Sequence, residues 1–352
     1  MIFEGFKSEV GEWLQGTGPD SDLVISSRVR LARNLANSPF TSVADEDQSR
    51  KVADRIAVAL DRLGSGLPLQ VHPLENRPVV ERQVLVERHL VSHELATGEG
   101  PRLVGFDETE SFSVMGNEED HLRLQVMKSG NQLDQAWEQM CPLERALEEE
   151  LQFAFHSKYG YLTACPTNVG TGLRASVMLH LPALVITGQI EQVTSAATKI
   201  HLAVRGLFGE GTEAQGDFFQ ISNQRTLGLT EEQILDNIAS VLPRIIEYER
   251  KLREELLERR RERIEDRIGR AYGILSHAHV MTSKEALEHL SLVRLGVTMG
   301  LLDEVSMTQV NRMFLHSQPG HLQCLQGEPL SSDDRDRKRA DLLRGILGDS
   351  AG

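Results

Sequence analysis

The sequence is poor in cysteine and has no long apolar run. Its 352 residues include three cysteines, too few and too scattered for a disulfide framework: Cys141, Cys165 and Cys324. No apolar stretch is long enough to cross a bilayer, and the N-terminal MIFEGFKSEV lacks the basic and then apolar pattern of a signal peptide. The sequence therefore predicts a cytoplasmic protein that works in a reducing environment and does not bind membranes.

Basic residues are outnumbered by acidic residues. The chain has 38 Lys and Arg against 52 Asp and Glu, which gives a net charge of −14 at pH 7. Such a chain is a poor general partner for nucleic acid. In the run ERRRERIEDR, residues 258–267, acids and bases alternate as they do on a solvated helix face. Any anion site must therefore be a local concentration of arginine.

The common phosphate-binding loops are also missing. The chain contains neither G-x-x-x-x-G-K-[ST] nor the kinase-type G-x-G-x-x-G. Five arginines in structured places are the alternative: Arg28, Arg30, Arg123, Arg174 and Arg205. A guanidinium group can bind two phosphate oxygens at once and stays charged, so the five would suit a triphosphate if the fold brought them together. Taken singly, each arginine has the character of an ordinary surface residue.

Periodicity predicts an α+β part followed by a helical part. A strand over residues 22–35 would place Arg28 and Arg30 on one face, because strand side chains alternate. The other predicted strands are 82–92, 218–224 and three strands within 101–127. The predicted helices are 45–63, 131–156 with an interruption at Pro142, one that follows a Gly-rich loop within 164–181, and a long one opened by the capping box at Thr230–Gln233. No strand is expected beyond that point.

This change of pattern sets the predicted domains. Hydrophobic residues make up 40% of the chain, enough for a sizeable core, and the length allows two domains. Residues 1–20 form an N-terminal segment, 21–245 the α+β domain, and 246–352 a helical domain.

The stretch GNEEDHLRLQ, residues 116–125, sets three acids side by side: Glu118, Glu119 and Asp120. Adjacent acids usually mark a solvated turn. They can also hold a cation, either Mg²⁺ or a guanidinium group, together with a later acid such as Glu210. The spacing is not specific for a metal, so the residues alone leave these alternatives open.

Cys165 precedes Pro166 and Thr167 close to a predicted helix N-terminus. That position can lower the pKa of a thiol and make it reactive. The alternative is a small buried cysteine that only fills space.

Four strings in this order resemble the phosphagen (guanidino) kinases over about residues 20–245: SSRVRLARN, NEEDHLR, ACPTNVGTGLRASV and RGLFGEGTEAQGDFFQISNQRTLGLTE. The resemblance implies an α+β fold, in which an antiparallel sheet is flanked by helices, and ATP in an arginine-lined site. It implies no metal held by the protein, because Mg²⁺ would be carried by ATP.

The resemblance also assigns roles to residues. It implies these nucleotide-binding residues: Ser26, Ser27, Arg28, Val29, Arg30, His89, Arg123, Arg174, Ala175, Ser176, Val177, Met178, Arg205, Gly206, Leu207, Phe208 and Gly209. Met178 stands where the family usually has histidine. Glu119 would be the catalytic base with Glu118 beside it, Glu210 the second carboxylate for the guanidinium, and Cys165 a neighbour of the reacting nitrogen.

The chain departs from arginine and creatine kinases. It lacks their helical N-terminal domain and carries a helical C-terminal region instead, a layout similar to the bacterial protein arginine kinases. RDRKRA, residues 335–340, matches the RDxxRA phosphoarginine-sensing motif of that family. The match implies an allosteric phosphoarginine site made of Arg335, Asp336, Arg339 and Ala340. On a helix, Arg335 and Arg339 would share a face.

Three functions follow as hypotheses. The first is ATP-dependent phosphorylation of exposed arginines in proteins, which would mark proteins for degradation and regulate stress-response repressors. It implies protein substrates, an activator protein, protease–chaperone machinery and a homodimer or higher homo-oligomer. The second is a phosphagen kinase for free arginine or a related guanidino compound. The third is a non-catalytic adaptor that binds phosphoarginine.

Overall fold

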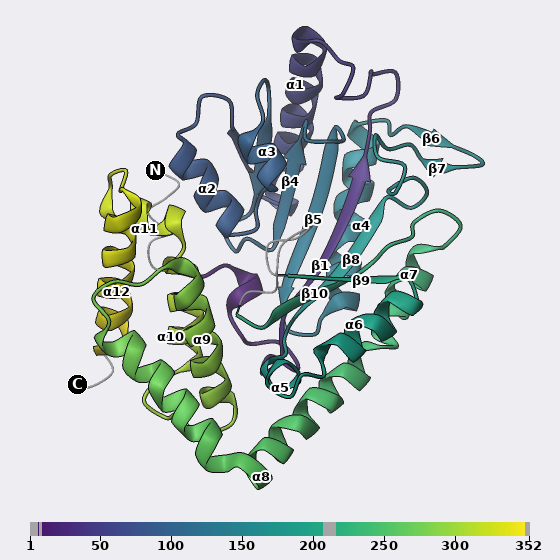
Figure 1. Cartoon of the computed structure of the whole chain (residues 1–352). Coiled ribbons are helices and arrows are strands. Elements are labelled where there is room, and N and C mark those ends of the chain that lie inside the picture. Colours follow the sequence, from purple (N-terminus) through teal and green to yellow (C-terminus); the bar gives the residue numbers. More distant parts are fainter. Residues whose placement is uncertain (1–5, 7–8, 207–215, 349–352) are drawn as a thin grey trace.

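The computed structural model describes residues 6, 9–206 and 216–348, and its centre is one eight-stranded sheet (Figure 1). The strand order is β2-β3-β4-β5-β1-β8-β10-β9, and every neighbouring pair is antiparallel. The strands are β1 (Val24–Arg33), β2 (Gln70–Pro73), β3 (Leu103–Phe106), β4 (Phe112–Gly116), β5 (Leu122–Ser129), β8 (Leu173–His180), β9 (Leu202–Gly206) and β10 (Phe218–Asn223). A separate hairpin consists of β6 (Phe155–His156) and β7 (Gly160–Tyr161).

Helices flank this sheet and form the whole C-terminal region (Figure 1). They are α1 (Glu46–Arg62), α2 (Val79–Glu87), α3 (His93–Thr97), α4 (Leu133–Glu150), α5 (Pro182–Ile186), α6 (Ile190–Lys199), α7 (Glu231–Ala239), α8 (Leu242–His277), α9 (Ser283–Thr298), α10 (Met307–His316), α11 (Pro319–Gln326) and α12 (Ser332–Gly348). In the part of the chain that the structure describes, 3₁₀ helices lie at η2 (Glu12–Leu14) and η3 (Gly64–Gly66). None of the described helices is both long and apolar enough to span a membrane. The predicted fold class is confirmed.

One face of the sheet packs on helices. Alternate residues of its central strands, such as Leu31 and Val177, are 0% exposed and join a core with α1, α4, α6 and α7. Helix α1 shows why the sequence folds this way. Asp45 and Gln48 form a capping box at its start, and its apolar residues recur at helical spacing to face the core.

The opposite face is covered at two sides and carries the arginines between them. On one side, α2 and α3 form a core with Val104 and Met115. On another, the C-terminal helices pack on Met127, Met178 and Phe218. The helical region is therefore docked on the same face of the sheet that carries the arginines.

Helix α8 belongs to both parts of the molecule. Its backbone is non-helical at Arg260, and Figure 1 shows the resulting change of direction. Before this kink Leu252 and Leu256 belong to the core under the sheet, whereas Ile264 and Ile268 after it belong to the C-terminal core. The predicted boundary at residue 245 lies inside the first half of this helix.

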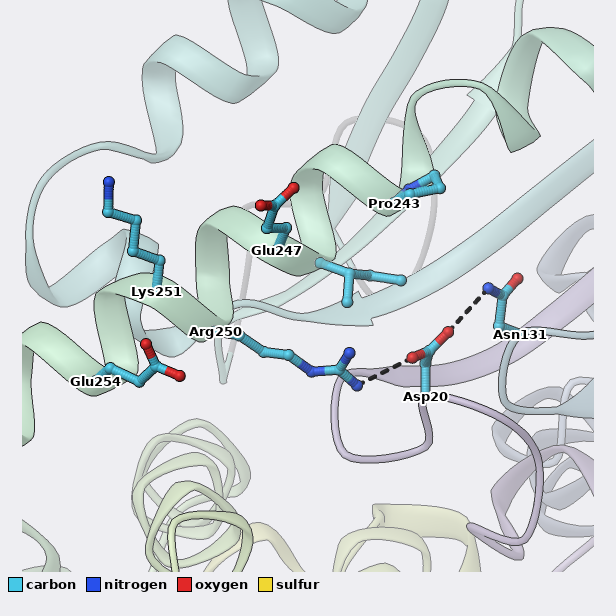
Figure 2. Close-up of a pocket in the computed structure, with 8 residues that line it drawn as sticks. Asp20, Asn131, Pro243, Glu247, Arg250, Lys251 and Glu254 are labelled. Atoms are coloured by element: carbon cyan, nitrogen blue, oxygen red, sulfur yellow. Dashed lines mark hydrogen bonds and ion pairs between the residues drawn. The ribbon is translucent and has the colours of Figure 1, made fainter.

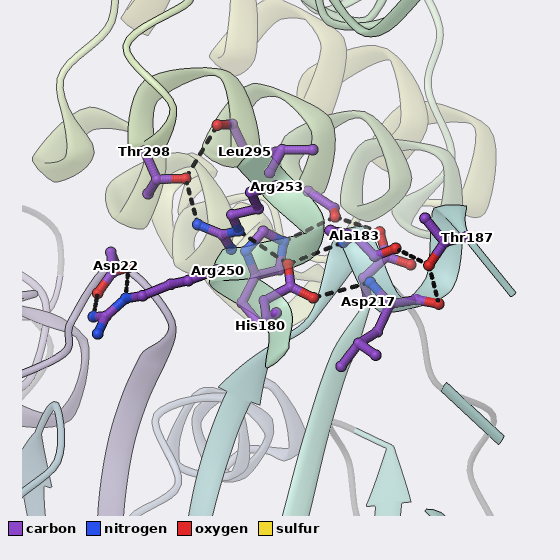
Figure 3. Close-up of polar contacts among 12 residues, drawn as sticks. Asp22, His180, Ala183, Thr187, Asp217, Arg250, Arg253, Leu295 and Thr298 are labelled. Atoms are coloured by element: carbon purple, nitrogen blue, oxygen red, sulfur yellow. Dashed lines mark hydrogen bonds and ion pairs between the residues drawn. The ribbon is translucent and has the colours of Figure 1, made fainter. Parts of the chain in front are cut away.

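A buried carboxylate also fixes α8 to the sheet body (Figure 3). Glu249 is 0% exposed and accepts hydrogen bonds from the backbone N–H groups of Ala183 and Leu184, each at 2.9 Å, at the start of α5. Arg253 donates to Glu249 at 2.9 Å and to Thr298 of α9 at 3.0 Å. Burial raises the pKa of Glu249, and these donors oppose the rise. The carboxylate thus caps α5 from α8, and Arg253 links this cap to α9 of the C-terminal region.

Two predicted elements have the wrong type. Residues 82–92 were expected to form a strand, but helix α2 ends at Glu87 and a turn follows, because Val84 and Leu85 pack into a core that outweighs the β-propensity of valine. The segment after the Gly-rich loop was expected to be a helix, but it is β8. There Leu173 and Val177 face the helices whereas Arg174 faces away, an alternation typical of a strand.

Two predicted helices have the wrong length. The helix predicted over 131–156 ends at Glu150, and the residues after it lead to β6. The interruption predicted at Pro142 is wrong, because α4 continues through this residue. The capping box of Thr230 and Gln233 is present, but it opens the nine-residue α7 rather than a long helix. The other predicted elements, including the strand 22–35 and the helix 45–63, are confirmed.

Candidate active site

The register of the sheet brings the arginines of the central strands together. Arg28 and Arg30 alternate with buried apolar residues along β1. Arg174 of β8 lies directly opposite Arg30, and Arg123 of β5 lies directly opposite Ala32. Directly opposed residues share a face of an antiparallel sheet, as do alternate residues of one strand. These four arginines therefore project from the same face.

The fifth arginine follows through one more pair of strands. Arg205 of β9 is opposite Gln220 of β10, which is opposite Met178 of β8. Met178 is four residues after Arg174 on the same strand and so shares its face. All five predicted arginines thus lie on one face, on β5, β1, β8 and β9, with β10 between the last two.

Two arginines of the cluster, Arg28 and Arg30, have lowered pKa values. Burial, followed by the charges of Arg174 and Arg123, lowers the pKa of Arg28 to about 10. Burial and the three other cations lower the pKa of Arg30 well below its usual range, opposed by Glu118. The Nε atom of Arg30 is buried and lacks a hydrogen-bond partner among the described residues. Partly buried like charges are unfavourable without a counter-ion, so this face suits a polyanion.

His89 lies beside this cluster in an unusual backbone conformation. Its φ is +58°, its carbonyl accepts from Nε2 of Gln125 at 2.7 Å, and its ring lies edge-on to Trp13 at 4.6 Å. Burial and the nearby Arg28 and Arg30 lower the pKa of His89 to about 3. The imidazole is therefore neutral at physiological pH and adds no charge to the anion site.

The acidic turn between β4 and β5 is held by buried contacts. Glu118 and Asp120 are buried, whereas the Glu119 side chain is 44% exposed. Oδ1 of Asp120 accepts from Nδ2 of Asn34 and from the backbone N–H of Ala164, both at 2.6 Å. Asp120 thereby ties the acidic turn to the end of β1 and to the residue that precedes Cys165, and Glu119 is left facing solvent.

Arg123 joins the acidic turn to the arginine cluster. Its Nη1 lies 2.7 Å from Oε2 of Glu118, and its Nη2 lies 3.3 Å from Oε2 of Glu119. Ser92, the N-cap of α3, donates to Oε1 of Glu118 at 2.9 Å. The carboxylate of Glu119 is thus adjacent to the face that carries the arginines, and it is exposed enough to contact a cationic group of a ligand.

Glu119 also has a contact with Cys165. Burial raises the pKa of Glu119, Arg123 opposes this rise, and a hydrogen bond with Cys165 lowers the pKa as well. The Sγ atom of Cys165 lies 2.9 Å from Oγ1 of Thr167. The prediction that Cys165 precedes a helix is wrong, because β8 follows the loop. Its neighbour is a carboxylate rather than a helix N-terminus.

Some residues implied at the nucleotide point to the other face. Ser27 is 0% exposed, donates to the carbonyl of Gly130 at 2.8 Å and accepts from the N–H of Gln132 at 3.0 Å. Three apolar residues face the helix-side core: Val29, Ala175 and Val177. The side chains of these four residues are therefore directed away from the arginines.

The remaining implied residues divide into two groups. Ser26, Ser176 and Met178 lie on the arginine face, and Nε of Arg28 donates to Oγ of Ser176 at 3.4 Å. Gly206 ends β9. The others lie outside the described residues: Leu207, Phe208, Gly209 and Glu210.

The RDxxRA residues lie on α12, far along the chain from this site. Arg339 is 1% exposed and donates to the carbonyls of Ser317 and Met281 at 2.8 Å and to Asp336 at 2.6 Å. Ala340 is buried. Arg335, which donates to the carbonyl of Leu330 at 3.1 Å, is partly exposed. Arg339 therefore links α12 to the backbone at Ser317 and Met281. Arg335 is the more accessible of the two arginines.

Several residues of the site had not been predicted. Gln125 and Trp13 contact His89, whereas Asn34 and Ser92 hold the acidic turn. Asn34 and Gln125 stand within or beside the quoted motifs, so the signal for them was present. Trp13 and Ser92 give no local signal, because only the tertiary fold brings them to the site.

A cleft of about 650 Å³ lies elsewhere, along the first half of α8 (Figure 2). Asp20 accepts there from Arg250 at 3.0 Å and from Asn131 at 3.1 Å, so these charged and polar groups are already paired with one another. Among the described residues no group of three or more His, Cys, Asp and Glu is arranged to hold a metal ion.

Comparison with known proteins agrees with this geometry. The family described as ATP:guanido phosphotransferase, C-terminal catalytic domain, matches residues 51–252, and the Protein-arginine kinase McsB C-terminal domain matches residues 261–351. Among solved structures, a duplicated taurocyamine kinase from Schistosoma mansoni with bound transition-state-analogue components has a TM-score of 0.62 and 29% identity, over 71% of this chain and 36% of that chain. A lombricine kinase has a TM-score of 0.59 and 26% identity, over 71% and 76%.

The fold is thus that of a guanidino phosphotransferase, the class of enzymes that moves a phosphoryl group between ATP and a guanidino group. Two curated relatives indicate which family within this class the chain resembles. Protein-arginine kinases of Moorella thermoacetica and Halothermothrix orenii are 48% and 47% identical, over 96% and 95% of this chain and 97% and 96% of theirs. The chain belongs to the protein-arginine kinase family.

Proposed function

We propose that this protein transfers the γ-phosphoryl group of ATP to arginine side chains of other proteins. The observation that carries the proposal is the position of Arg123. It belongs to the five-arginine face and is also paired with Glu119 at 3.3 Å. The arginine face, which suits the phosphates of ATP, is therefore next to the carboxylate of Glu119, which suits the guanidinium of the acceptor. The reaction requires both groups side by side.

The chemistry follows from the charges. A guanidinium group has a pKa above about 12 and is a poor nucleophile. Glu119 would orient one nitrogen and accept its proton while the N–P bond forms and the bond from the γ-phosphorus to the β–γ bridging oxygen breaks. Arg28 and Arg30 would neutralise the phosphates of the donor and of the departing ADP. Mg²⁺, when bound to the phosphates, would supply further positive charge. Glu210 remains the proposed second carboxylate.

A raised pKa suits Glu119 to this role. Burial raises the pKa of the Glu119 carboxylate and makes it a stronger base than an ordinary glutamate, while the charge of Arg123 opposes this rise. We propose that the thiol of Cys165, hydrogen-bonded to Glu119, assists electrostatically beside the reacting nitrogen.

The β6–β7 hairpin supports a protein substrate rather than a free amino acid. Phe155 and Tyr159 are 62% and 45% exposed. The carbonyl of Leu162, just after the hairpin, accepts from Asn34, whose amide also binds Asp120 next to Glu119. The hairpin that carries these aromatic side chains is therefore linked through Asn34 and Asp120 to the turn that holds Glu119. An extended protein segment could bury the aromatic side chains, whereas free arginine has only a short aliphatic stem.

The decisive experiment offers ATP with either an unfolded protein or free arginine. Mass spectrometry under non-acidic conditions would detect the acid-labile N–P bond. We expect phosphoarginine in the protein and little product from free arginine. The reverse preference would support a phosphagen kinase, and no ATP turnover with either acceptor would support a non-catalytic adaptor.

A double variant tests the role of the hairpin. Phe155→Ser with Tyr159→Ser should lower kcat/KM for the unfolded protein by about tenfold, because interface aromatics typically contribute more than 1 kcal/mol, and leave any turnover of free arginine unchanged. Ile200→Ser is the control, since Ile200 is 48% exposed at the end of α6. Equal effects of both variants on the protein substrate would contradict this role.

We further propose a regulatory phosphoarginine site at α12. Arg335 would pair with the phosphoryl group and Asp336 with the guanidinium. Because Arg339 is buried in structural hydrogen bonds, Arg335→Ala is the cleaner test. It should keep basal turnover and lose the response to added phosphoarginine. A response equal to that of the unaltered protein would exclude Arg335 from such a site.

The cellular role belongs to the same proposal. We propose that the protein acts in the cytoplasm as a homodimer or higher homo-oligomer. Its phosphoarginine would mark proteins for a protease–chaperone machine and inactivate stress-response repressors, with an activator protein in control. Light scattering of the purified protein would test the oligomer, and a purely monomeric enzyme with full activity would contradict it.

A further inference from the structure

A buried contact joins the helical C-terminal region to the end of α2. The Glu87 carboxylate accepts from the backbone N–H groups of Gly320 at 2.7 Å and His321 at 2.9 Å, and it lies 2.7 Å from Nδ1 of the His321 ring. Glu87 is 8% exposed and His321 is 2% exposed. A side chain of the sheet domain therefore caps the N-terminus of α11, which Figure 1 shows against α2.

The next residue, Arg88, holds the other side of the same imidazole. Its Nη1 lies 3.4 Å from Nε2 of His321, and its Nε and Nη2 donate to Oε1 of Glu110 at 2.8 and 2.5 Å. Arginine can only donate, so Nε2 accepts and the proton of His321 is on Nδ1, where it is donated to Glu87. Burial lowers the pKa of His321, which agrees with a neutral ring. Two consecutive residues thus fix one histidine of the helical region from both nitrogens.

The third residue in this run is His89, which lies at the arginine cluster. A left-handed φ is unfavourable for a residue other than glycine and persists only where the surroundings enforce it. Gln125 holds the His89 carbonyl from β5, and the preceding Glu87 is held by α11. The conformation of His89 is therefore fixed jointly by the sheet and by the C-terminal region.

The other end of this connection reaches α12. Arg339 donates to the carbonyl of Ser317, two residues before Pro319 begins α11, and to the carbonyl of Met281. From α12 to the arginine face the chain of contacts is short. It runs from Arg339 through the start of α11 to Glu87, and from there along two peptide bonds to His89.

We infer that Glu87 and His321 are positioning residues through which the helical region sets the place of His89 and thereby the affinity for nucleotide. This inference rests on the proposed function in one respect, namely that the arginine face binds ATP. A displacement of α11 would move the Glu87 carboxylate and release the strained backbone at His89. The affinity for ATP would fall, and the affinity for the protein substrate would not.

The molecule offers a matched control for this inference. Glu249 is also a buried carboxylate that caps a short helix, but its partners Ala183, Leu184 and Arg253 lie on α5 and α8 (Figure 3). Glu87→Gln and Glu249→Gln each remove one buried charge and preserve shape. A purely structural role predicts the same consequences for both.

The first measurement needs no nucleotide. The chain has two tryptophans, and Trp13 contacts His89. In a Trp137→Phe background, Trp13 emission should change in Glu87→Gln and in His321→Ala but not in Glu249→Gln. Because this signal reports on His89 directly, it is informative even if the protein transfers no phosphoryl group.

The second measurement is steady-state kinetics. Glu87→Gln should raise KM for ATP by about tenfold, within the range usual for coupled sites, with KM for the unfolded protein changed less than about twofold. Glu249→Gln should change neither the KM for ATP nor the KM for the unfolded protein. Unchanged Trp13 emission in both Glu87→Gln and His321→Ala would overturn the inference. So would a rise of KM for ATP in Glu249→Gln that equals the rise in Glu87→Gln. Glu87→Gln keeps it testable if His321→Ala fails to fold.

Discussion

Adjacent residues of one strand, β1, belong to faces with opposite physical character. Leu31 is 0% exposed and packs among apolar side chains. Arg30, its neighbour, lies among three other arginines, and its Nε lacks a partner among the described residues. The first face stabilises the fold by burial, whereas the second holds cations whose mutual repulsion destabilises it. A substitution at Leu31 should therefore change mainly stability, and a substitution at the adjacent Arg30 should change mainly anion binding.

The largest expected effect concerns the carboxylate beside the arginine face. Glu119→Gln removes a proton acceptor and keeps its shape, so turnover should fall by about 10²–10⁴. Stability should change little, because Glu119 is 44% exposed. Single-turnover kinetics and ATP titration would measure both. Near-normal transfer by this variant would mean that another group is the base.

A change on the helix face should have the opposite profile. Leu31→Ala leaves a cavity in the core and should lower the free energy of unfolding by about 2–5 kcal/mol. Denaturant unfolding would measure this loss. At low temperature, where the variant is still folded, kcat should remain within about twofold of the original value, since Leu31 faces away from the arginines. A large loss of kcat would show that the two faces are coupled.

Arg30→Met should stabilise the protein while it removes an anion contact. A cation whose pKa is lower in the folded state than in the unfolded state destabilises the fold while it is charged, below its unfolded-state pKa. Its removal should raise the free energy of unfolding by about 1 kcal/mol. Thermal melts should also show that ATP stabilises this variant less than the original protein. A lower melting temperature without ligand would contradict the like-charge argument.

The smallest effect is expected at the thiol. Cys165→Ser keeps a hydroxyl near Glu119 but removes the sulfur, so activity should fall by about tenfold or less, below the usual contribution of a general base. A thiol-blocking reagent should inhibit the original protein, with partial protection by ATP, and spare the serine variant. If the serine variant is inhibited as strongly, the sensitive thiol is Cys141 or Cys324.

Local sequence determined much of this protein. The alternation in residues 22–35 predicted β1 and the common face of Arg28 and Arg30, because a strand has a period of two. The capping box of Thr230 and Gln233 predicted the start of α7. The motif strings predicted the family, since long unusual strings in order are specific. The same alternation was present in LRASVMLH, residues 173–180, where a strand was mistaken for a helix.

Only the tertiary structure decided how distant residues meet. The register of five strands brings Arg123, Arg174 and Arg205 to the face of β1, and no local pattern encodes a register between strands far apart in the chain. The same holds for Glu87 and His321, which are 234 residues apart and in contact. Periodicity reports which side of an element is buried. Which elements then face each other depends on the packing of whole faces, a property of the folded chain rather than of any segment.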